Sequence, residues 1–263
     1  MSTQAYDIVK LARSNKRPTG LDYIQNLCGD FLELHGDRCY ADDAAIVGGV
    51  GHFRGIPVTF VAIEKGHSAK ERMSRFFGAP HPEGYRKALR LMRQAEKFHR
   101  PVLCFVDTSG AYCGIGAEER GQGQAIAENL MGMMSLNTPV ITLLIGEGGS
   151  GGALALSVAD RVWMLENAVY SDLPRLCQHP LKDAGKADEA AQRLRLQPGR
   201  AELGSLRRSS PSGIWASPRF MACWRTVWKR SFTCSWDRRT CSSAATRAFA
   251  PLEAQNPWRP SPW

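Results

Sequence analysis

The sequence predicts an α/β fold built on a buried, largely parallel sheet. Three observations support this prediction. Segments with strand-like and helix-like hydrophobic periods alternate along residues 1–171. The segments 102–106 and 140–145 are uninterrupted apolar runs, which is typical of strands covered on both faces. A glycine-rich stretch, IGEGGSGGALAL, joins the second run to a helix-like segment, and functional groups collect at the carboxyl ends of such strands.

The helix-like segments carry an apolar stripe at a spacing of three to four residues. In the segment 21–34 this stripe contains Leu21, Ile24 and Phe31. The segment 82–98 begins with a proline, which suits the first position of a helix. The expected helices cover residues 6–14, 21–34, 82–98, 117–136 and 151–159.

The strand-like segments are short and rich in β-branched residues. Arg54 and Gly55 separate two of them, which predicts a hairpin, and residues 114–116 are expected to form a loop. The expected strands cover residues 45–53, 56–63, 102–106, 140–145, 161–165 and 168–170.

Charge and composition divide the chain into two regions. Residues 1–171 contain 18 Lys and Arg against 18 Asp and Glu, whereas residues 172–263 contain 16 against 7 and carry the whole net charge of +9. The second region holds six of the seven Trp but only one Val and one Ile, so it has little material for strands. We expect a folded domain at 1–171 and an irregular or disordered region after it.

Targeting and metal-site patterns are missing from the sequence. No apolar run approaches the ~20 residues of a membrane span, and the first residues have no secretory pattern, so we expect a cytoplasmic protein without membrane contact. The eight cysteines show no C-x-x-C and no zinc-ligand spacing, so no metal is expected in this chain.

The glycine-rich stretch admits several interpretations. Gly146, Gly148 and Gly151 fit the dinucleotide fingerprint, with Glu166 at the distance of a ribose ligand, but the following helix is short for that motif. Ser150 fits a nucleophile elbow, but the only downstream His is His179. The stretch could also serve only as a tight packing turn. The interpretation that needs no further residue is an anion site formed by unpaired backbone N–H groups at a helix start.

The neutral region resembles the alpha subunit of the bacterial carboxyltransferase of acetyl-CoA carboxylase. The resemblance rests on LDYIQNLCGDFLELHGDR, YADDAAIVGGV, PHPEGYRKALRLM, GIGAEERGQGQAIAENLM, IGEGGSGGALAL and VADRVWMLENAVYS. It implies the crotonase-like (ClpP/crotonase) ββα-spiral fold. It also implies transfer of CO2 from carboxybiotin on a carrier protein to acetyl-CoA, which gives malonyl-CoA for fatty-acid biosynthesis.

The resemblance assigns roles to individual residues. The pair Gly151 and Gly152 is implied to stabilise the oxyanion that biotin acquires when it loses CO2, through backbone N–H groups. Further residues are expected to bind carboxybiotin or the other substrate: Gly148, Gly149, Gly110, Gly114, Gly116, Lys65 and Arg86. Arg86 opens a basic helix face that could meet CoA phosphates or a partner subunit, or could simply face solvent; this face comprises Arg86, Lys87, Arg90, Arg93 and Lys97.

The resemblance also implies partners. The family works as an α2β2 assembly with the biotin carboxyl carrier protein. The beta subunit holds acetyl-CoA and a zinc ribbon. Biotin is the cofactor, and ATP is used only by the separate biotin carboxylase component.

The chain departs from the family pattern after residue 171. Family members continue VISPEGCASILWKDA, whereas this chain reads DLPRLCQHPLKDA. One codon set for Gly-Cys-Ala-Ser-Ile-Leu, read two bases later, encodes residues 176–181 of this chain, and residues 182–196 again resemble a family helix. We interpret 172–181 and 197–263 as out-of-frame translation, and we expect a poorly assembled, inactive subunit.

Two alternative functions remain open at this point. A hydratase or hydrolase acting on a CoA thioester would need a carboxylate over the thioester, for which Glu118 and Glu119 are candidates. Nucleic-acid binding would use the interleaved Trp and Arg residues of ACWRTVWKRSF, although no binding fold is apparent around them. Glu118 and Glu119 are more simply explained as charges at the start of a helix, so we expect the carboxyltransferase and no nucleic-acid partner.

Overall fold

The computed structural model describes residues 5–165, 167–171 and 197–198. The predicted helix at 182–196, and almost all of the region after residue 171, therefore lie outside the described residues. The helices are α1 (Ala5–Ala12), α2 (Gly20–Leu27), α3 (Ala69–Ser74), the 3-10 turn η1 (Phe76–Gly78), α4 (Pro82–Lys97), α5 (Ile115–Glu119), α6 (Gln122–Ser135) and α7 (Ser150–Leu154). The strands are β1 (Leu32–Glu33), β2 (Ile46–Phe53), β3 (Ile56–Ile63), β4 (Val102–Thr108), β5 (Val140–Gly149), β6 (Arg161–Met164), β7 (Val169–Ser171) and β8 (Gln197–Pro198).

The strands form one mixed sheet in the order β1-β2-β3-β4-β5-β7-β8, with β6 also paired to β5. The pairs β3–β4, β4–β5, β5–β6 and β5–β7 are parallel, and the hairpin β2–β3 is antiparallel. Every residue of β4 and β5 is buried, as their continuous apolar sequence predicts. The predicted α/β fold with largely parallel strands is confirmed.

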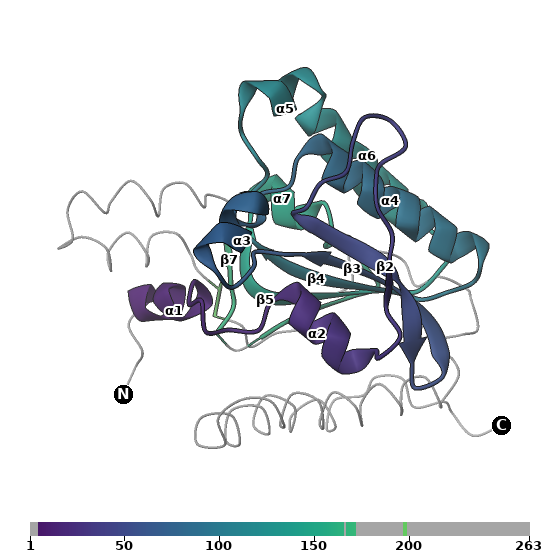
Figure 1. Cartoon of the computed structure of the whole chain (residues 1–263), viewed down its shortest axis with the longest axis horizontal. Coiled ribbons are helices and arrows are strands. Elements are labelled where there is room, and N and C mark those ends of the chain that lie inside the picture. The colour runs from purple at the N-terminus through teal and green to yellow at the C-terminus, as the bar shows by residue number, and fades with distance from the viewer. Residues whose placement is uncertain (1–4, 166, 172–196, 199–263) are drawn as a thin grey trace. The chain divides into compact units, whose positions relative to one another are not determined.

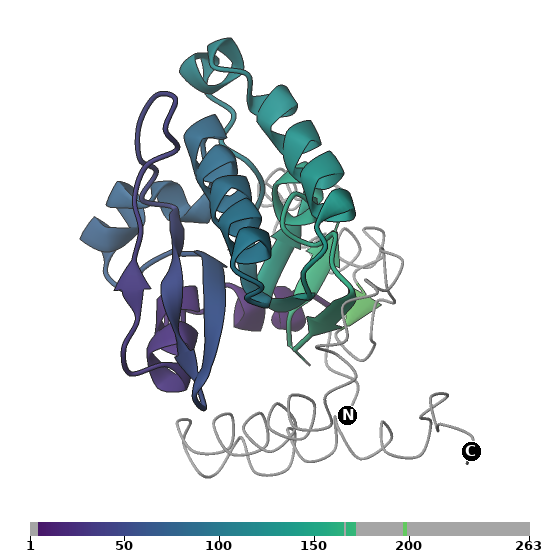
Figure 2. The ribbon, with the colours of Figure 1, turned by 90° about the vertical axis from the view of Figure 1, so that its right-hand side faces the viewer.

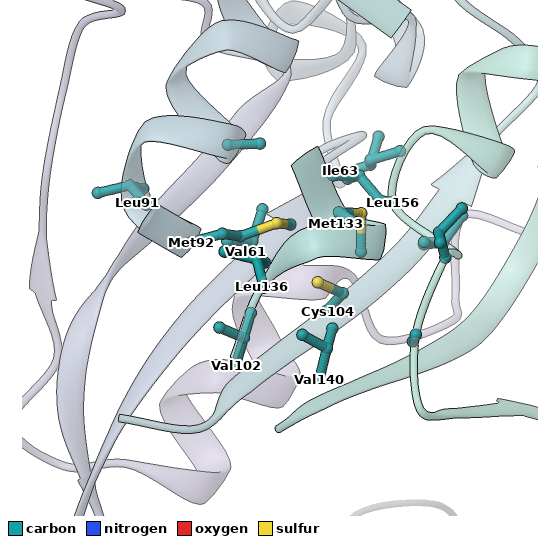
Figure 3. Packing of buried hydrophobic residues seen from close by; sticks show 14 of the residues in the cluster. Val61, Ile63, Leu91, Met92, Val102, Cys104, Met133, Leu136, Val140 and Leu156 are labelled. Atoms are coloured by element: carbon teal, nitrogen blue, oxygen red, sulfur yellow. The ribbon is translucent and has the colours of Figure 1, made fainter. Parts of the chain in front are cut away.

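Helices cover both faces of this sheet (Figures 1 and 2). Helices α4 and α6 lie side by side over one face, and α2 packs on the opposite face, where Tyr23 stacks on Phe105 at 5.5 Å between ring centroids. Figure 3 shows the core between the sheet and the α4–α6 layer, where Leu91, Met92 and Met133 meet alternate residues of the central strands. No helix among the described residues is long and apolar enough to cross a membrane.

Local sequence signals explain the hairpin and the longest helix. Arg54 and Gly55 have φ angles of 50° and 77°, the left-handed pair that a two-residue hairpin turn requires. Pro82 occupies the first turn of α4, where its missing N–H costs no hydrogen bond. Both predictions are confirmed.

The predicted helix at 21–34 is wrong beyond Leu27. Cys28 ends α2 in an extended conformation, and the chain turns through Gly29 into β1. Strand β1 pairs with β2, and a Cβ at Gly49 would collide with the carbonyl oxygen of Leu32. The apolar residues keep a helical spacing through residue 34, and this spacing does not show that the backbone pairs with β2 instead.

Two further helix predictions need correction. The segment 117–136 is not one helix, because Gly121 has a φ of 80° and separates α5 from α6. The segment 151–159 is helical only through Leu154 as part of α7. The strand before it is longer than predicted, so Gly146, Gly148 and Gly149 belong to β5 rather than to a turn.

Leu91 lies fully buried between α4 and the sheet, whereas Arg93 on the same helix is exposed. Leu91→Ala is expected to lower the free energy of unfolding by about 2–5 kcal/mol because it leaves a cavity in the core. Arg93→Ala serves as the matched control and should change it by less than about 0.5 kcal/mol. Urea unfolding of both variants measures the difference; equal values would contradict this packing.

Candidate active site

The carboxyl ends of three neighbouring parallel strands bring charged residues together. Lys65 follows β3, Asp107 lies near the end of β4, and Glu147 lies near the end of β5. The Lys65 Nζ is 2.8 Å from Asp107 Oδ1 and 3.0 Å from Glu147 Oε2. Arg13, just after α1, donates from Nε to Glu147 Oε1 at 2.6 Å. We call Lys65, Asp107, Glu147 and Arg13 the strand-end ion cluster.

The strand-end ion cluster is buried but balanced. The side chains of Lys65, Asp107 and Glu147 are each about 10% exposed. Burial by itself raises the pKa of Glu147, but the charges of Lys65 and Arg13 outweigh it and lower that pKa. Burial likewise opposes the charged form of Lys65, and the two carboxylates reverse this and raise its pKa. Each charge is therefore stable only because its partners are present.

Two backbone segments meet beside this cluster. One segment follows β4 and contains Ser109 and Gly110. The other runs from Gly149, the last residue of β5, to Gly152 in the first turn of α7, and we call it the glycine turn. A Cβ at Gly149 would collide with the Ser109 carbonyl, and a Cβ at Gly152 would collide with the Ala111 nitrogen. Gly110 has a φ of 146°, which favours glycine. At Gly149 and Gly152 the two segments therefore approach so closely that their backbones touch.

This contact leaves backbone donors at the start of α7. The N–H groups of the first turn of a helix, including those of Gly151 and Gly152, have no acceptor within the helix. Because α7 has only five residues, these N–H groups rather than a long helix dipole would attract an anion. The buried Tyr85 hydroxyl donates to the Gly152 carbonyl at 3.4 Å and anchors the turn to α4.

The glycines of this stretch have different neighbours. A Cβ at Gly148 would press on Leu144 and Tyr170, so Gly148 allows β7 to pack against β5. A Cβ at Gly151 would meet Ile126 of α6 only at ordinary contact distances of 3.7–3.9 Å. Among the predicted anion-site residues, Gly152 is thus sterically required to be glycine and Gly151 is not.

The described residues complete neither of the two motif alternatives. The fingerprint glycines Gly146 and Gly148 lie inside a strand, and Glu166 lies outside the described residues. Ser150 is exposed and has a left-handed φ of 48° between a strand and a helix, which is the backbone geometry of a nucleophile elbow, but that motif also needs a histidine base. Within the described part of the chain, no hydrogen bond joins its hydroxyl to a histidine, and no group of three metal-ligating residues occurs.

The remaining predicted site residues each make contacts of their own within the chain. Gly114 caps α5 next to the Tyr112 ring, and Gly116 lies in the first turn of α5 near Arg120. The Lys65 ammonium is bound by two carboxylates rather than open to a ligand.

Arg86 is also engaged within the chain. Its Nε donates to Asp37 Oδ2 at 2.8 Å, one terminal nitrogen donates to the Arg120 carbonyl, and the other is 3.6 Å from Glu83. The basic face is not a uniform solvated or phosphate-binding stripe, because Lys87 is fully buried and donates to Asp42 at 2.6 Å. The helical spacing of these cations could not reveal that the acidic loop 37–43 binds Arg86 and Lys87, whereas Arg93 and Lys97 are exposed.

Sequence reasoning missed several residues that shape the site. Asp107 and Glu147 are acidic residues at the ends of buried apolar strands, and this position could have predicted that each binds a cationic side chain. Tyr85 and Gln122 gave no such signal. Gln122 donates through Nε2 to the carbonyls of Pro80 and Tyr112, and so ties together two loops at the same edge of the sheet. Glu118 and Glu119 lie exposed on α5.

The lowered pKa of Glu147 predicts how stability changes with pH. Its charge stabilises the fold fully above its usual pKa of 4.5, and this contribution is lost as the pH falls toward the lowered value. Glu147→Gln is expected to cost about 3–5 kcal/mol at pH 7 and distinctly less at pH 3. Urea unfolding at both pH values measures this, with the exposed Glu128→Gln as control. A cost that does not change with pH would contradict the charge assignment.

Comparison with known proteins places the chain in a family. A family model described as "Acetyl co-enzyme A carboxylase carboxyltransferase-like" matches residues 2–204. The acetyl-coenzyme A carboxylase carboxyl transferase subunit alpha of Ruminiclostridium cellulolyticum is 63% identical over 194 residues, which are 73% of this chain and 75% of that protein. A Clostridium tetani protein named for the subunits beta/alpha is 58% identical over 194 residues, which are 73% of this chain and 34% of that protein. The chain therefore spans three quarters of the first relative and one third of the second.

Solved structures agree at the level of the fold. Transcarboxylase 12S with hydrolysed methylmalonyl-coenzyme A bound has a TM-score of 0.59 at 18% identity, over 99% of this chain and 45% of that one. The matched structures are carboxyltransferases of the crotonase fold, which confirms the predicted fold class. The comparisons support the carboxyltransferase prediction and neither of the two alternatives. This chain belongs to the family of acetyl-CoA carboxylase carboxyltransferase alpha subunits.

Proposed function

We propose that this chain supplies the oxyanion-stabilising half of a carboxyltransferase that moves CO2 from carboxybiotin to acetyl-CoA and gives malonyl-CoA for fatty-acid biosynthesis. The observation that supports the proposal is the backbone contact between the glycine turn and the segment after β4, in a chain of this family. The oxygen of a planar ureido group could approach such N–H groups, because Gly151 and Gly152 carry no side chains of their own.

The chemistry needs little from the side chains of this chain. Carboxybiotin would supply the CO2, negative charge would develop on its ureido oxygen as the N–CO2 bond breaks, and the ureido group would take up the proton that the acetyl-CoA methyl group loses when the new C–C bond forms. The Gly151 and Gly152 N–H groups would stabilise that charge, and a single donor of this kind is worth about 10²–10³ in rate in other enzymes. Tyr85 and the backbone of Gly110 would hold these donors in place, so that they need no reorganisation during the reaction.

The partners follow from the same proposal. Relatives named for the subunits beta/alpha combine both subunits in one protein, which supports a beta subunit as the partner. We propose that this subunit holds acetyl-CoA, that the assembly is α2β2, and that the carrier protein delivers biotin. ATP would be used only by the separate biotin carboxylase component, and the reaction would take place in the cytoplasm.

The region after residue 171 bears on whether the proposed activity is retained. Its composition is poor in strand-forming residues, and residues 205–263 lie beyond the match to the family. We propose that 172–181 and 197–263 arise from out-of-frame translation and weaken assembly with the beta subunit. An uninterrupted, verified reading frame whose relatives share these residues would contradict that origin.

Replacing residues 172–263 with the corresponding part of the Ruminiclostridium cellulolyticum relative tests this proposal. The chimera, mixed with that organism's beta subunit and a carboxylated carrier protein, is expected to form malonyl-CoA. The unmodified chain is expected to form none above background. Analytical ultracentrifugation of both mixtures compares assembly, and equal turnover by the two proteins would refute the proposed effect of the region.

Two adjacent glycines provide a matched pair for testing the site. Gly152→Ala forces a Cβ against the Ala111 nitrogen and is expected to lower kcat of the chimera by about 10²-fold or more. Gly151→Ala places its Cβ toward Ile126 in ordinary contact and is expected to keep kcat within a few-fold. Steady-state carboxyl transfer, with circular dichroism to check folding, measures both. If Gly152→Ala folds and retains full turnover, the glycine turn is not the oxyanion site.

A further inference from the structure

The pairing of β4 with β5 is interrupted directly before the glycine turn. Val106 pairs with Leu144, but Thr108 pairs with Gly148, so the single residue Asp107 faces the three residues 145–147. Such a bulge leaves backbone groups without a partner in the sheet. It also sets how far the end of β5 lies from the end of β4.

The Asp107 side chain closes this gap. Its Oδ1 accepts the backbone N–H of Glu147 at 2.9 Å and also binds the Lys65 Nζ at 2.8 Å. A Cβ at Gly146 would collide with the Asp107 carboxylate and with Arg17, so Gly146 provides the room for this arrangement. The dinucleotide-like glycine at this position is therefore explained by the bulge.

Lys65 connects the bulge to a third strand. Its ammonium binds both carboxylates, one on each side of the bulge, and Gly78 of η1 covers its aliphatic stem. Without Lys65, the buried carboxylates of Asp107 and Glu147 would lose the one cation that binds both of them, and would keep only Arg13 on Glu147 and the Arg17 guanidinium beside Gly146 nearby. Gly149 follows Glu147 by two residues, and Ser109 follows Asp107 by two. If β4 and β5 move apart at the bulge, the two segments of the site therefore move apart as well.

We infer that Lys65 is a positioning residue, which fixes the β4–β5 bulge and thereby the distance between the glycine turn and the segment after β4. The kinetic consequence rests on the proposed function, whereas the structural consequence does not. Lys65 binds no substrate in this account, because its Nζ is occupied by Asp107 and Glu147.

Hydrogen exchange of the full chain, followed by mass spectrometry, tests the structural consequence. Lys65→Met is expected to speed amide exchange across residues 145–152 by ~10-fold or more, because the bulge opens locally. Lys87→Met is the matched control, since Lys87 is also a buried lysine and its Nζ is bound to Asp42 and the Asp43 carbonyl on another part of the fold. It should leave exchange at 145–152 at the wild-type rate and speed it in the loop 37–43.

A second variant and a kinetic measurement complete the test. Asp107→Asn keeps an oxygen for the Glu147 N–H but removes the charge that Lys65 binds, so we expect a smaller increase in the amide exchange rate at 145–152. This variant also serves as the test if Lys65→Met does not fold. In the chimera with its beta subunit, Lys65→Met should lower kcat by about 10- to 100-fold with little change in KM.

The outcomes separate the two proposals. The positioning role is overturned if amide exchange at 145–152 is no faster in Lys65→Met than in Lys87→Met. If Lys65→Met does not fold, unchanged exchange at 145–152 in Asp107→Asn overturns it instead. Faster exchange with unchanged kcat in an active assembly also overturns it, because the bulge would then not control the turn. If the wild-type chimera forms no malonyl-CoA, the proposed function fails while the exchange result still decides whether Lys65 holds the bulge.

Discussion

A lysine ammonium between two buried carboxylates is the interaction on which the site of this protein depends. Lys65, Asp107 and Glu147 come from the ends of three parallel strands, and a low-dielectric interior tolerates these charges only as a group. The Asp107 carboxylate also binds a backbone N–H of β5 at the bulge. One set of contacts thus neutralises buried charge, binds the Glu147 N–H at the bulge and aligns two strand ends. The glycine turn begins two residues beyond that alignment.

The glycines of IGEGGSGGALAL meet several separate demands. Gly146 leaves room for the Asp107 and Arg17 side chains, and Gly148 allows β7 to approach β5. Gly149 and Gly152 allow direct backbone contact with the segment after β4. A motif pattern treats these positions as equivalent, but each has a different neighbour. The three-dimensional contacts therefore explain why one stretch can match several motifs while each of its glycines is required, where it is required, by a different neighbour.

Much of the fold was predictable from local physical rules. The hairpin at Arg54 and Gly55, the proline start of α4 and the buried central strands all follow from backbone preferences and hydrophobic periodicity. The helix predicted across Cys28 ended early because β1 pairs with β2, whereas the helix predicted across Gly121 was divided by the left-handed backbone of Gly121 itself. Periodicity also did not reveal that the loop 37–43 binds Arg86 and Lys87 of α4, since it shows which side chains share a face and not what covers that face.

The sequence by itself determined the α/β class, the order of most elements, the family resemblance and the glycine-rich stretch, because these depend on residue type and spacing along the chain. Only the tertiary structure decided the roles of Lys65, Asp107, Glu147 and Arg86. These residues are far apart in sequence, and their charged groups form ion pairs only because the fold brings distant segments together. The distinction between Gly151 and Gly152 is of the same kind, because it depends on which atoms a missing Cβ would have touched.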